Sequence, residues 1–307
     1  MKKYFTFFID DNIRFLENLT LNSPRSAFDD NYLRMLKKLH EKYGMKVQLN
    51  LFYENDTFNL SQMTDAYKEE FLENKDWLRF GFHAKKEVPD WPYINASYKD
   101  VWDDYTLFES EVERFAGKEM ISDSLITHWV AMTKEGIQAL RDKGAKMMSV
   151  TTGDRIEYPE IRSVFSTEHN FWLDENKKRN VSPASVCRRD TNGLVGAPSF
   201  CNYNHLENSL ADKYMGKIKM YQDADTGMYF NRFAGITMNA VRLCDFPSSL
   251  EELSKYEYVG LLIHEQYFYE DYFAYEKDFA KKIDYAFDFL LKKGFTHLSM
   301  QDLLKYQ

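Results

Sequence analysis

Three times along this chain, an amphipathic helix is predicted to end at a glycine, and an apolar strand follows at once. The predicted pairs are residues 30–43 with 45–52, 133–143 with 145–150, and 275–293 with 295–300, and the glycines between them are Gly44, Gly144 and Gly294. Glycine accepts the left-handed backbone that terminates a helix. This alternation of helix and strand predicts βα units and a mostly parallel sheet.

Apolar runs predict further strands at residues 4–9, 77–82, 124–127 and 258–263, and helices are expected near 61–73 and 105–115. The 307 residues suit one α/β domain, 1–307, with an insertion, because single α/β barrels often run to about 250 residues. Residues 151–255 break the alternation, with many Asn and short aromatic runs. We interpret them as an irregular insertion, with short antiparallel strands as one option.

The first predicted strand ends in two adjacent carboxylates, Asp10 and Asp11. Two like charges at the tip of a buried strand repel each other and lose hydration. A protein keeps such a pair most easily where a cation or a reacting proton compensates it. The alternative for an isolated Asp-Asp pair is the solvated start of a loop. Other residues of the chain are needed to choose between these two interpretations.

Three other predicted strands also end in side chains that can bind a metal or transfer a proton. They are followed by His83, by His128, and by His264 with Glu265. In parallel βα folds, functional side chains gather where the strands end. Asp and His together suit zinc, cobalt, nickel or manganese with open positions for water and substrate. The set therefore predicts metal-assisted hydrolysis.

Net charge and cysteine content limit the partners and the cellular compartment that we expect for this protein. The net charge is −8, which disfavours nucleic acid and anionic membranes as partners because phosphates need a basic surface. The apolar run after Met1-Lys2-Lys3 stops at Asp10, which is too short for a signal peptide. No stretch reaches the length of a membrane span. The odd count of 3 cysteines favours a reducing compartment, so we expect a cytoplasmic protein.

These residues resemble the motifs of the polysaccharide deacetylase superfamily of metal-dependent carbohydrate esterases. That family opens with a strand ending in Thr-Phe-Asp-Asp-Gly, and Phe8-Ile9-Asp10-Asp11-Asn12 stands in its place. Its His-x-x-x-His motif is similar to the segment from His83 to Glu87. Its Leu-x-His strand, long helix and Lys-x-Gly-aromatic segment resemble Leu262-Ile263-His264 through Lys293-Gly294-Phe295. The resemblance covers about residues 4–150 and 256–306 and implies a distorted β/α barrel of about seven parallel strands.

By this resemblance Asp10 would be the catalytic base, Asp11 and His83 metal ligands, and His264 the catalytic acid. The reaction would remove an acetyl or similar acyl group from a sugar or a related amide, with a divalent metal, most simply zinc. Glu87 replaces the second histidine of the family motif. It would either supply the third ligand itself or be a solvated helix charge beside Lys85 and Lys86, in which case His128 would supply the third ligand. Asn12 replaces the family glycine, and the arginine-proline motif that orients the base is missing.

These departures leave two alternatives to a deacetylase. A non-catalytic carbohydrate-binding or regulatory relative would keep the fold with a degenerate site. A metal-dependent isomerase or carbon-carbon lyase would reuse the same fold for other chemistry. Acetate release, sugar binding without turnover, and a rearranged product distinguish the three.

Overall fold

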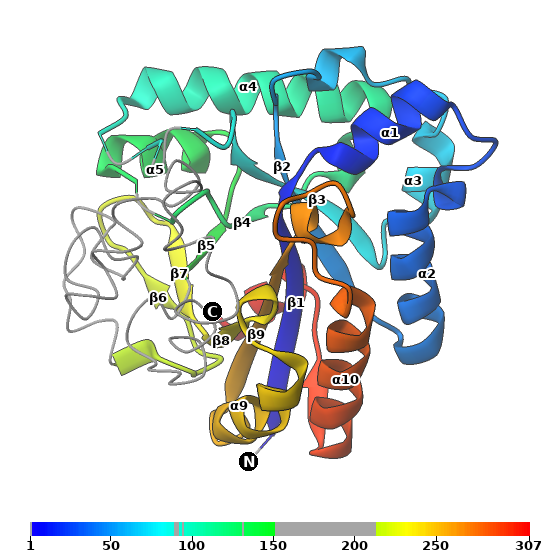
Figure 1. The fold of residues 1–307 in the computed structure, drawn as a ribbon. Helices are drawn as coiled ribbons and strands as arrows, with labels where there is room; N and C mark the ends of the chain where they lie inside the picture. Colours follow the sequence, from blue (N-terminus) through cyan, green and yellow to red (C-terminus); the bar gives the residue numbers. More distant parts are fainter. Residues whose placement is uncertain (1, 89–91, 94, 131, 151–212) are drawn as a thin grey trace, which may run out of the picture.

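The central sheet of the protein is parallel. The structure is a computed structural model that describes residues 2–88, 92–93, 95–130, 132–150 and 213–307 (Figure 1). The strand order is β3-β2-β1-β9-β8, and β10 also pairs with β1. The strands are β1 (Lys3–Asn12), β2 (Val47–Phe52), β3 (Leu78–Ala84), β8 (Ala234–Thr237), β9 (Tyr258–His264) and β10 (Phe295–His297). All pairs in this sheet are parallel.

A second, smaller sheet adjoins the main sheet at β3. Its order is β4-β5-β7-β6, and only the β6–β7 pair is antiparallel. The strands are β4 (Ser124–Leu125), β5 (Met147–Val150), β6 (Tyr221–Gln222) and β7 (Tyr229–Arg232). An isolated parallel bridge between Phe80 and Ile121 joins the two sheets. The α/β class and the mostly parallel sheet are therefore confirmed, whereas the described strands form two linked sheets and no closed barrel of about seven strands.

Helices cover the sheets on the outside (Figure 1). They are α1 (Arg14–Asn22), α2 (Asn31–Tyr43), α3 (Lys68–Glu73), α4 (Tyr98–Phe115), α5 (Lys134–Asp142), α9 (Phe246–Leu253) and α10 (Phe279–Lys292). Helices α2 and α10 lie beside the main sheet, and α4 packs against α5. Among the described residues, no helix combines the length and the hydropathy that a membrane span requires.

Helix α2 shows how local sequence sets these boundaries. The Asp30 carboxylate accepts hydrogen bonds from the backbone N–H groups of Tyr32 and Leu33 at 2.9 and 3.1 Å, which satisfies two free donors of the first turn. Gly44 ends the helix with φ of 63°. The predicted helix and its glycine are thus confirmed. Helix α4 begins earlier than predicted because Ser97 caps it.

The predicted insertion at 151–255 is described only in its last part. Residues 151–212 lie outside the described residues, so the prediction stays open there. From residue 213 onward the segment supplies β6, β7 and β8 to the two sheets, together with α9, a helix that the sequence analysis did not predict. The antiparallel β6–β7 pair agrees with the short antiparallel strands considered above.

Strand β1 runs through the middle of the main sheet, between β2 and β9. Its side chains are buried from Tyr4 to Asn12. A strand with neighbours on both sides and covered faces reads as a continuous apolar run. Because β1 is central, its carboxyl end brings Asp10 and Asp11 next to the ends of β9 and β2.

Candidate metal centre

Asp10 and Asp11 are both buried, with 4% and 8% of their surface exposed. Asp11 has φ of 60°, a left-handed conformation that is uncommon outside glycine. The pairing between β1 and β2 shifts register between Ile9 and Asn12. This irregularity interrupts the usual alternation of side chains, and both carboxylates lie close enough to His83 and His264 for their charges to interact.

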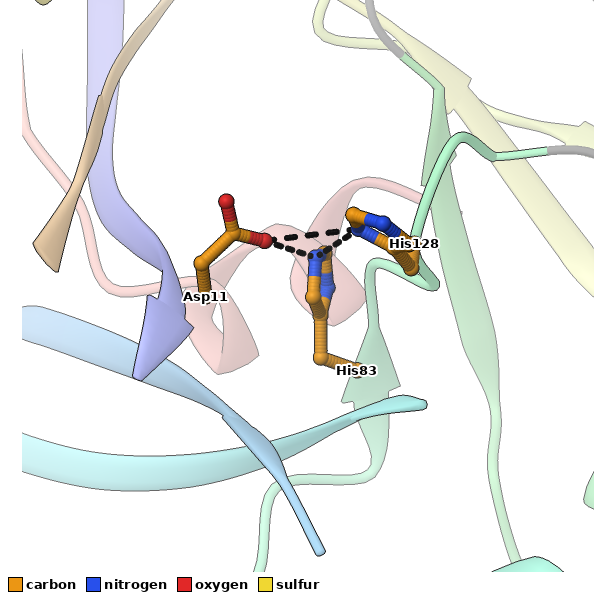
Figure 2. A group of neighbouring side chains, drawn as sticks. All are labelled: Asp11, His83 and His128. Atoms are coloured by element: carbon orange, nitrogen blue, oxygen red, sulfur yellow. Dashed lines mark hydrogen bonds and ion pairs between the residues drawn. The ribbon is translucent and has the colours of Figure 1, made fainter. Parts of the chain in front are cut away.

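Asp11, His83 and His128 bring three polar atoms together (Figure 2). His83 Nε2 lies 3.1 Å from Asp11 Oδ1, and His128 Nδ1 lies 3.3 Å from the same oxygen. The two ring nitrogens are 3.1 Å apart. Asp11 and His83 lie at the carboxyl ends of β1 and β3, and His128 lies in the segment that follows β4, as the positions of the polar residues in the sequence suggested.

The other nitrogen of each ring fixes which atom faces the cluster. His83 Nδ1 lies 2.7 Å from the carbonyl oxygen of Ile126, and His128 Nε2 lies 3.0 Å from that of Glu87. A carbonyl oxygen only accepts, so these nitrogens carry the hydrogen and donate it. In the neutral rings, the inward-facing nitrogens therefore offer lone pairs toward the Asp11 carboxylate.

Three acceptors that converge in this way need a positive partner. A proton can bridge only two of the three atoms, whereas a metal ion between them contacts all three. Two imidazoles and one carboxylate form a donor set that suits zinc or a similar divalent metal and leaves positions open for water and substrate. Carbonyl groups that hold the far side of ligating histidines are typical of metal sites. The residues present thus fit a divalent cation.

The protonation of these groups follows from burial and charge. Burial alone would raise the pKa of Asp11, but the His264 charge and hydrogen bonds with His128 and His83 lower it well below its usual range. Burial works against a charged His83, yet the charges of Asp10 and Asp11 raise the pKa of this ring. Without a metal, the site therefore attracts protons.

Asp10 stands beside this cluster and outside it. Asn50 Nδ2 donates to Asp10 Oδ1 at 2.6 Å. Burial raises the pKa of Asp10, although the charges of His83 and His264 and the Asn50 hydrogen bond oppose this effect. Asp10 also lies in register with His264 across the β1–β9 pair. A carboxylate with a raised pKa is suited to accept a proton.

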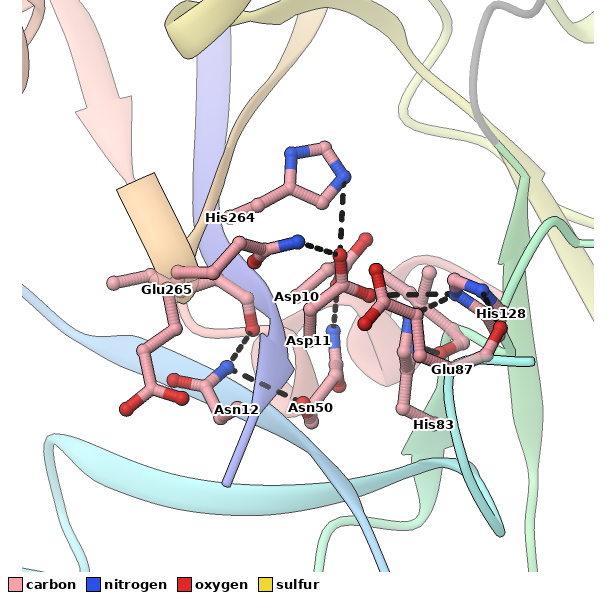
Figure 3. Close-up of polar contacts among 12 residues, drawn as sticks. Asp10, Asp11, Asn12, Asn50, His83, Glu87, His128, His264 and Glu265 are labelled. Carbon is pink, nitrogen blue, oxygen red and sulfur yellow. Dashed lines mark hydrogen bonds and ion pairs between the residues drawn. The ribbon is translucent and has the colours of Figure 1, made fainter. Parts of the chain in front are cut away.

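His264 faces the Asp pair from β9 and is the most exposed of the three histidines (Figure 3). Its Nδ1 lies 2.9 Å from Asn239 Oδ1, which also accepts the backbone N–H of His264. Nδ1 therefore carries the hydrogen, and Nε2 faces Asp11 Oδ2 at 4.0 Å. The ring can present a proton to the site only when it is doubly protonated.

The carboxylates of Glu87 and Glu265 are both outside the group of converging ligand atoms. The exposed Glu87 contributes its backbone carbonyl to His128, and its carboxylate is not among the three converging ligand groups. The Glu265 carboxylate turns away from Asp11 (Figure 3) and accepts the backbone N–H groups of residues 13–15 at 2.7 to 2.9 Å. Burial raises the pKa of Glu265 to about 7 against these hydrogen bonds.

Sequence reasoning missed three amide side chains at the site, those of Asn50, Asn239 and Gln266. Gln266 Nε2 donates to Asp11 Oδ2 at 2.8 Å. Asn50 could most easily have been recognised from the sequence, because it is a polar residue within the apolar run of β2. The other two lie in segments where polar residues are ordinary, so only the fold reveals them.

The turn after His128 is strained. Trp129 and Val130 both have positive φ, 57° and 62°, and this conformation is a genuine outlier for a β-branched residue such as valine. The backbone N–H of Val130 bonds to Thr127 at 2.8 Å, which closes the turn. Strained backbone of this kind gathers at functional sites, and here it occurs beside His128 as well as at Asp11.

Comparison with known proteins gives neighbours in structure only. No family model matches this chain, and no curated protein matches it either. A 4-alpha-glucanotransferase from Thermococcus litoralis superposes with a TM-score of 0.53 at 10% identity, over 100% of this chain and 41% of that one. This chain therefore spans less than half of the glucanotransferase, and the likeness concerns the fold alone.

Deacetylases are also among the similar structures. A family 4 carbohydrate esterase from Bacillus anthracis has a TM-score of 0.43 at 11% identity, over 100% of this chain and 84% of that one. A peptidoglycan deacetylase from Bacillus subtilis has a TM-score of 0.40 at 12% identity, over 99% and 91%. Both TM-scores are below 0.5, so these two likenesses indicate nothing about the function of this chain.

Proposed function

We propose that this protein is a metal-dependent hydrolase, a divergent relative of the polysaccharide deacetylases, that removes an acetyl or similar acyl group from a sugar or a related amide. The observation that carries the proposal is the convergence of Asp11 Oδ1, His83 Nε2 and His128 Nδ1, three acceptors within 3.3 Å of one another. These residues would hold a divalent metal, with zinc the first choice.

The remaining groups fit a hydrolysis in which the chain moves two protons. A bound divalent metal would polarise the acyl carbonyl and acidify a water molecule. Asp10 accepts the proton of the attacking water as its oxygen bonds to the acyl carbon. His264, doubly protonated, gives its Nε2 proton to the leaving nitrogen or oxygen as the bond to the acyl carbon breaks. The products are acetate and the free amine or alcohol.

The raised pKa of Asp10 supports its role as base, and the Asn239 contact supports that of His264. The hydrogen bond from His264 Nδ1 to Asn239 leaves Nε2 to face the site. Because the site offers candidate ligands, a candidate base and a candidate acid, a non-catalytic relative is not favoured. The carbohydrate nature of the substrate and a cytoplasmic location remain predictions from the sequence.

Acetate release from reloaded protein tests the proposal. The protein is stripped with a chelator, reloaded with Zn²⁺ or Co²⁺, and given N-acetylglucosamine oligomers and monomeric N-acetylated sugars. We expect acetate only from metal-loaded protein, and none from Asp11→Ala. His40→Gln is the matched control, because His40 stacks on Trp77 at 4.5 Å, away from the site. If no metal form of the wild-type protein releases acetate, and sugar binding survives Asp10→Asn, the results would instead support the non-catalytic relative.

A further inference from the structure

Each carboxylate of the adjacent pair accepts a hydrogen bond from a different amide side chain, and Figure 3 shows the Asn50 amide beside Asp10. Asn50 Nδ2 donates to Asp10 Oδ1 at 2.6 Å, and Gln266 Nε2 donates to Asp11 Oδ2 at 2.8 Å. Neither amide is part of the three-atom cluster. Two neighbouring aspartates with nearly the same covalent surroundings are thus held by two different elements, β2 and the turn Glu265–Phe268.

The two oxygens of Asp11 have different partners. Oδ1 faces His83 and His128, while Oδ2 accepts the amide of Gln266. An amide N–H₂ group directs partial positive charge at Oδ2 and opposes the approach of a cation to that oxygen. The carboxylate can then offer a metal one oxygen but not both. The hydrogen bond also fixes the carboxylate plane, as outer residues of metal sites do for their ligands.

Asn50 holds Asp10 through a rigid chain of hydrogen bonds. Asn50 Oδ1 accepts from Gln48 Nε2 at 2.7 Å, and the same nitrogen donates to the backbone oxygen of Ser124 at 2.8 Å. Because Asn50 Oδ1 is occupied by a donor, the Asn50 amide group must face Asp10 with its N–H₂ end. Both side chains are buried, with 2% of Gln48 and 0% of Asn50 exposed.

Gly81 makes room for this chain. It lies in register with Asn50 on the neighbouring strand β3. A Cβ atom at residue 81 would lie 2.3 Å from Asn50 Oδ1 and 2.5 Å from Gln48 Nε2, which is closer than real side chains approach. Only glycine at residue 81 therefore leaves space for the amides beside Asp10.

We propose that Gln266 and Asn50 are positioning residues that assign different roles to the two adjacent aspartates. Gln266 holds Asp11 so that only one of its oxygens faces the metal position. Asn50 holds Asp10 outside the ligand cluster, as the base, through a hydrogen bond from a neutral amide. The part of the proposal that concerns Asn50 rests on the proposed function, because its effect on turnover can be measured only if the protein catalyses the hydrolysis. The Gln266 half requires only that the site binds a cation.

Apolar replacements of similar size separate the two roles, with Co²⁺ as the probe. Gln266→Met removes the amide from Asp11, and Asn50→Leu removes it from Asp10. We expect Gln266→Met to weaken Co²⁺ binding about 10- to 100-fold and to change the visible spectrum of the bound cobalt, because Asp11 is free to offer both oxygens. Asn50→Leu should leave cobalt affinity and spectrum as in the wild type.

The kinetic measurement is made on the same variants, with acetate release from N-acetylglucosamine oligomers. Asn50→Leu should lower kcat by about 10- to 100-fold with little change in KM, because a misplaced base slows the chemical step. Asn50→Ser, a smaller polar replacement, serves if the leucine variant fails to fold, and circular dichroism and melting curves check both. Exchange of the partners, Asp10→Asn with Asn50→Asp, keeps a hydrogen bond but should abolish turnover without loss of cobalt.

The outcomes distinguish this inference from the proposed function. Equal loss of cobalt affinity in the Gln266 and Asn50 variants, or an unchanged cobalt spectrum in Gln266→Met, would overturn the division of roles. An Asn50 variant that folds, binds cobalt normally and keeps full kcat would overturn the Asn50 half. Wild-type protein that binds cobalt but releases no acetate would refute the proposed function, while the cobalt measurements would still decide the Gln266 half.

Discussion

His83 points one ring nitrogen at a carboxylate: Nε2 lies 3.1 Å from Asp11 Oδ1, while Nδ1 donates its hydrogen to the Ile126 carbonyl. In a neutral ring this contact is repulsive, and a cation or a proton makes it attractive. Protons and metal therefore compete for His83, whose pKa is raised by the neighbouring carboxylates despite burial. Metal affinity should consequently rise with pH as His83 loses its proton.

The third ligand can be identified by two substitutions. His128→Ala removes a ring nitrogen from the cluster and should weaken metal binding by at least about 100-fold, whereas Glu87→Gln should change it less than about threefold. Glu87 holds His128 through its backbone carbonyl, which the substitution preserves. Competition with a chromophoric chelator measures both affinities. The reverse order of effects would assign the ligand to Glu87.

Replacement of the base should separate metal binding from turnover. Asp10→Asn keeps the shape of the side chain but cannot accept the proton, so we expect hydrolysis to fall about 10²- to 10⁴-fold. Metal content should stay at the wild-type level because Asp10 is outside the cluster. In the wild type, burial raises the Asp10 pKa above 3.8, so activity should rise with pH as this group ionises. Full activity in Asp10→Asn would exclude Asp10 as base.

Glu265 stabilises the turn from β1, the strand that carries the Asp pair, into α1. Its carboxylate accepts three backbone N–H groups at the start of α1 and the hydroxyl of Tyr269. Glu265→Gln turns an N–H₂ group toward these donors, and we expect a loss of about 2–3 kcal/mol in the free energy of unfolding. Glu252→Gln is the control, since its exposed pair with Lys255 should contribute less than about 1 kcal/mol. Urea unfolding compares them, and equal effects would contradict the role of Glu265.

His297 makes stability depend on pH away from the site. It lies against the backbone of Lys46 and Phe5, and burial lowers the pKa of His297 from 6.5 to about 4. The unfolded ring takes up a proton that the folded ring resists. This contribution is therefore complete above pH 6.5 and is lost as the pH falls toward 4, by at most about 3 kcal/mol.

His297→Gln removes this proton linkage. The difference in unfolding free energy between the wild type and the variant should shrink between neutral pH and pH 4, because only the wild type loses the contribution of His297. Unfolding in urea at a series of pH values measures the difference, and taking it between two chains cancels the other titrating groups. A difference that stays constant over this range would show that His297 does not resist protonation.

Local signals predicted the parts of the fold that depend on neighbours in sequence. Asp30 and Gly44 mark the ends of α2, and the apolar run from Tyr258 ends at His264 as predicted. Helices α1 and α9 were missed, and α9 lies in a segment whose composition indicated irregular structure. The two-sheet arrangement depends on pairing between distant strands, which no local pattern specifies.

The candidate site was predictable for the same reason and to the same extent. The Asp and His residues stood out because strand ends converge in a parallel sheet. The choice between Glu87 and His128 stayed open because it depends on how β3 and β4 approach each other, through contacts such as His128 N–H to the His83 carbonyl at 2.9 Å. Asn50 is marked in the sequence only as a polar residue within an apolar strand, and the roles of Asn50 and Gln266 become visible through their contacts with Asp10 and Asp11.

The most direct test is the position of a metal in the crystallised, zinc-loaded protein, located by anomalous scattering at the zinc edge. We predict one ion bound by Asp11 Oδ1, His83 Nε2 and His128 Nδ1, with zinc–nitrogen distances of about 2.0–2.1 Å, and with Gln266 still bonded to Asp11 Oδ2. A zinc-soaked crystal with no anomalous peak among these three residues would contradict the account.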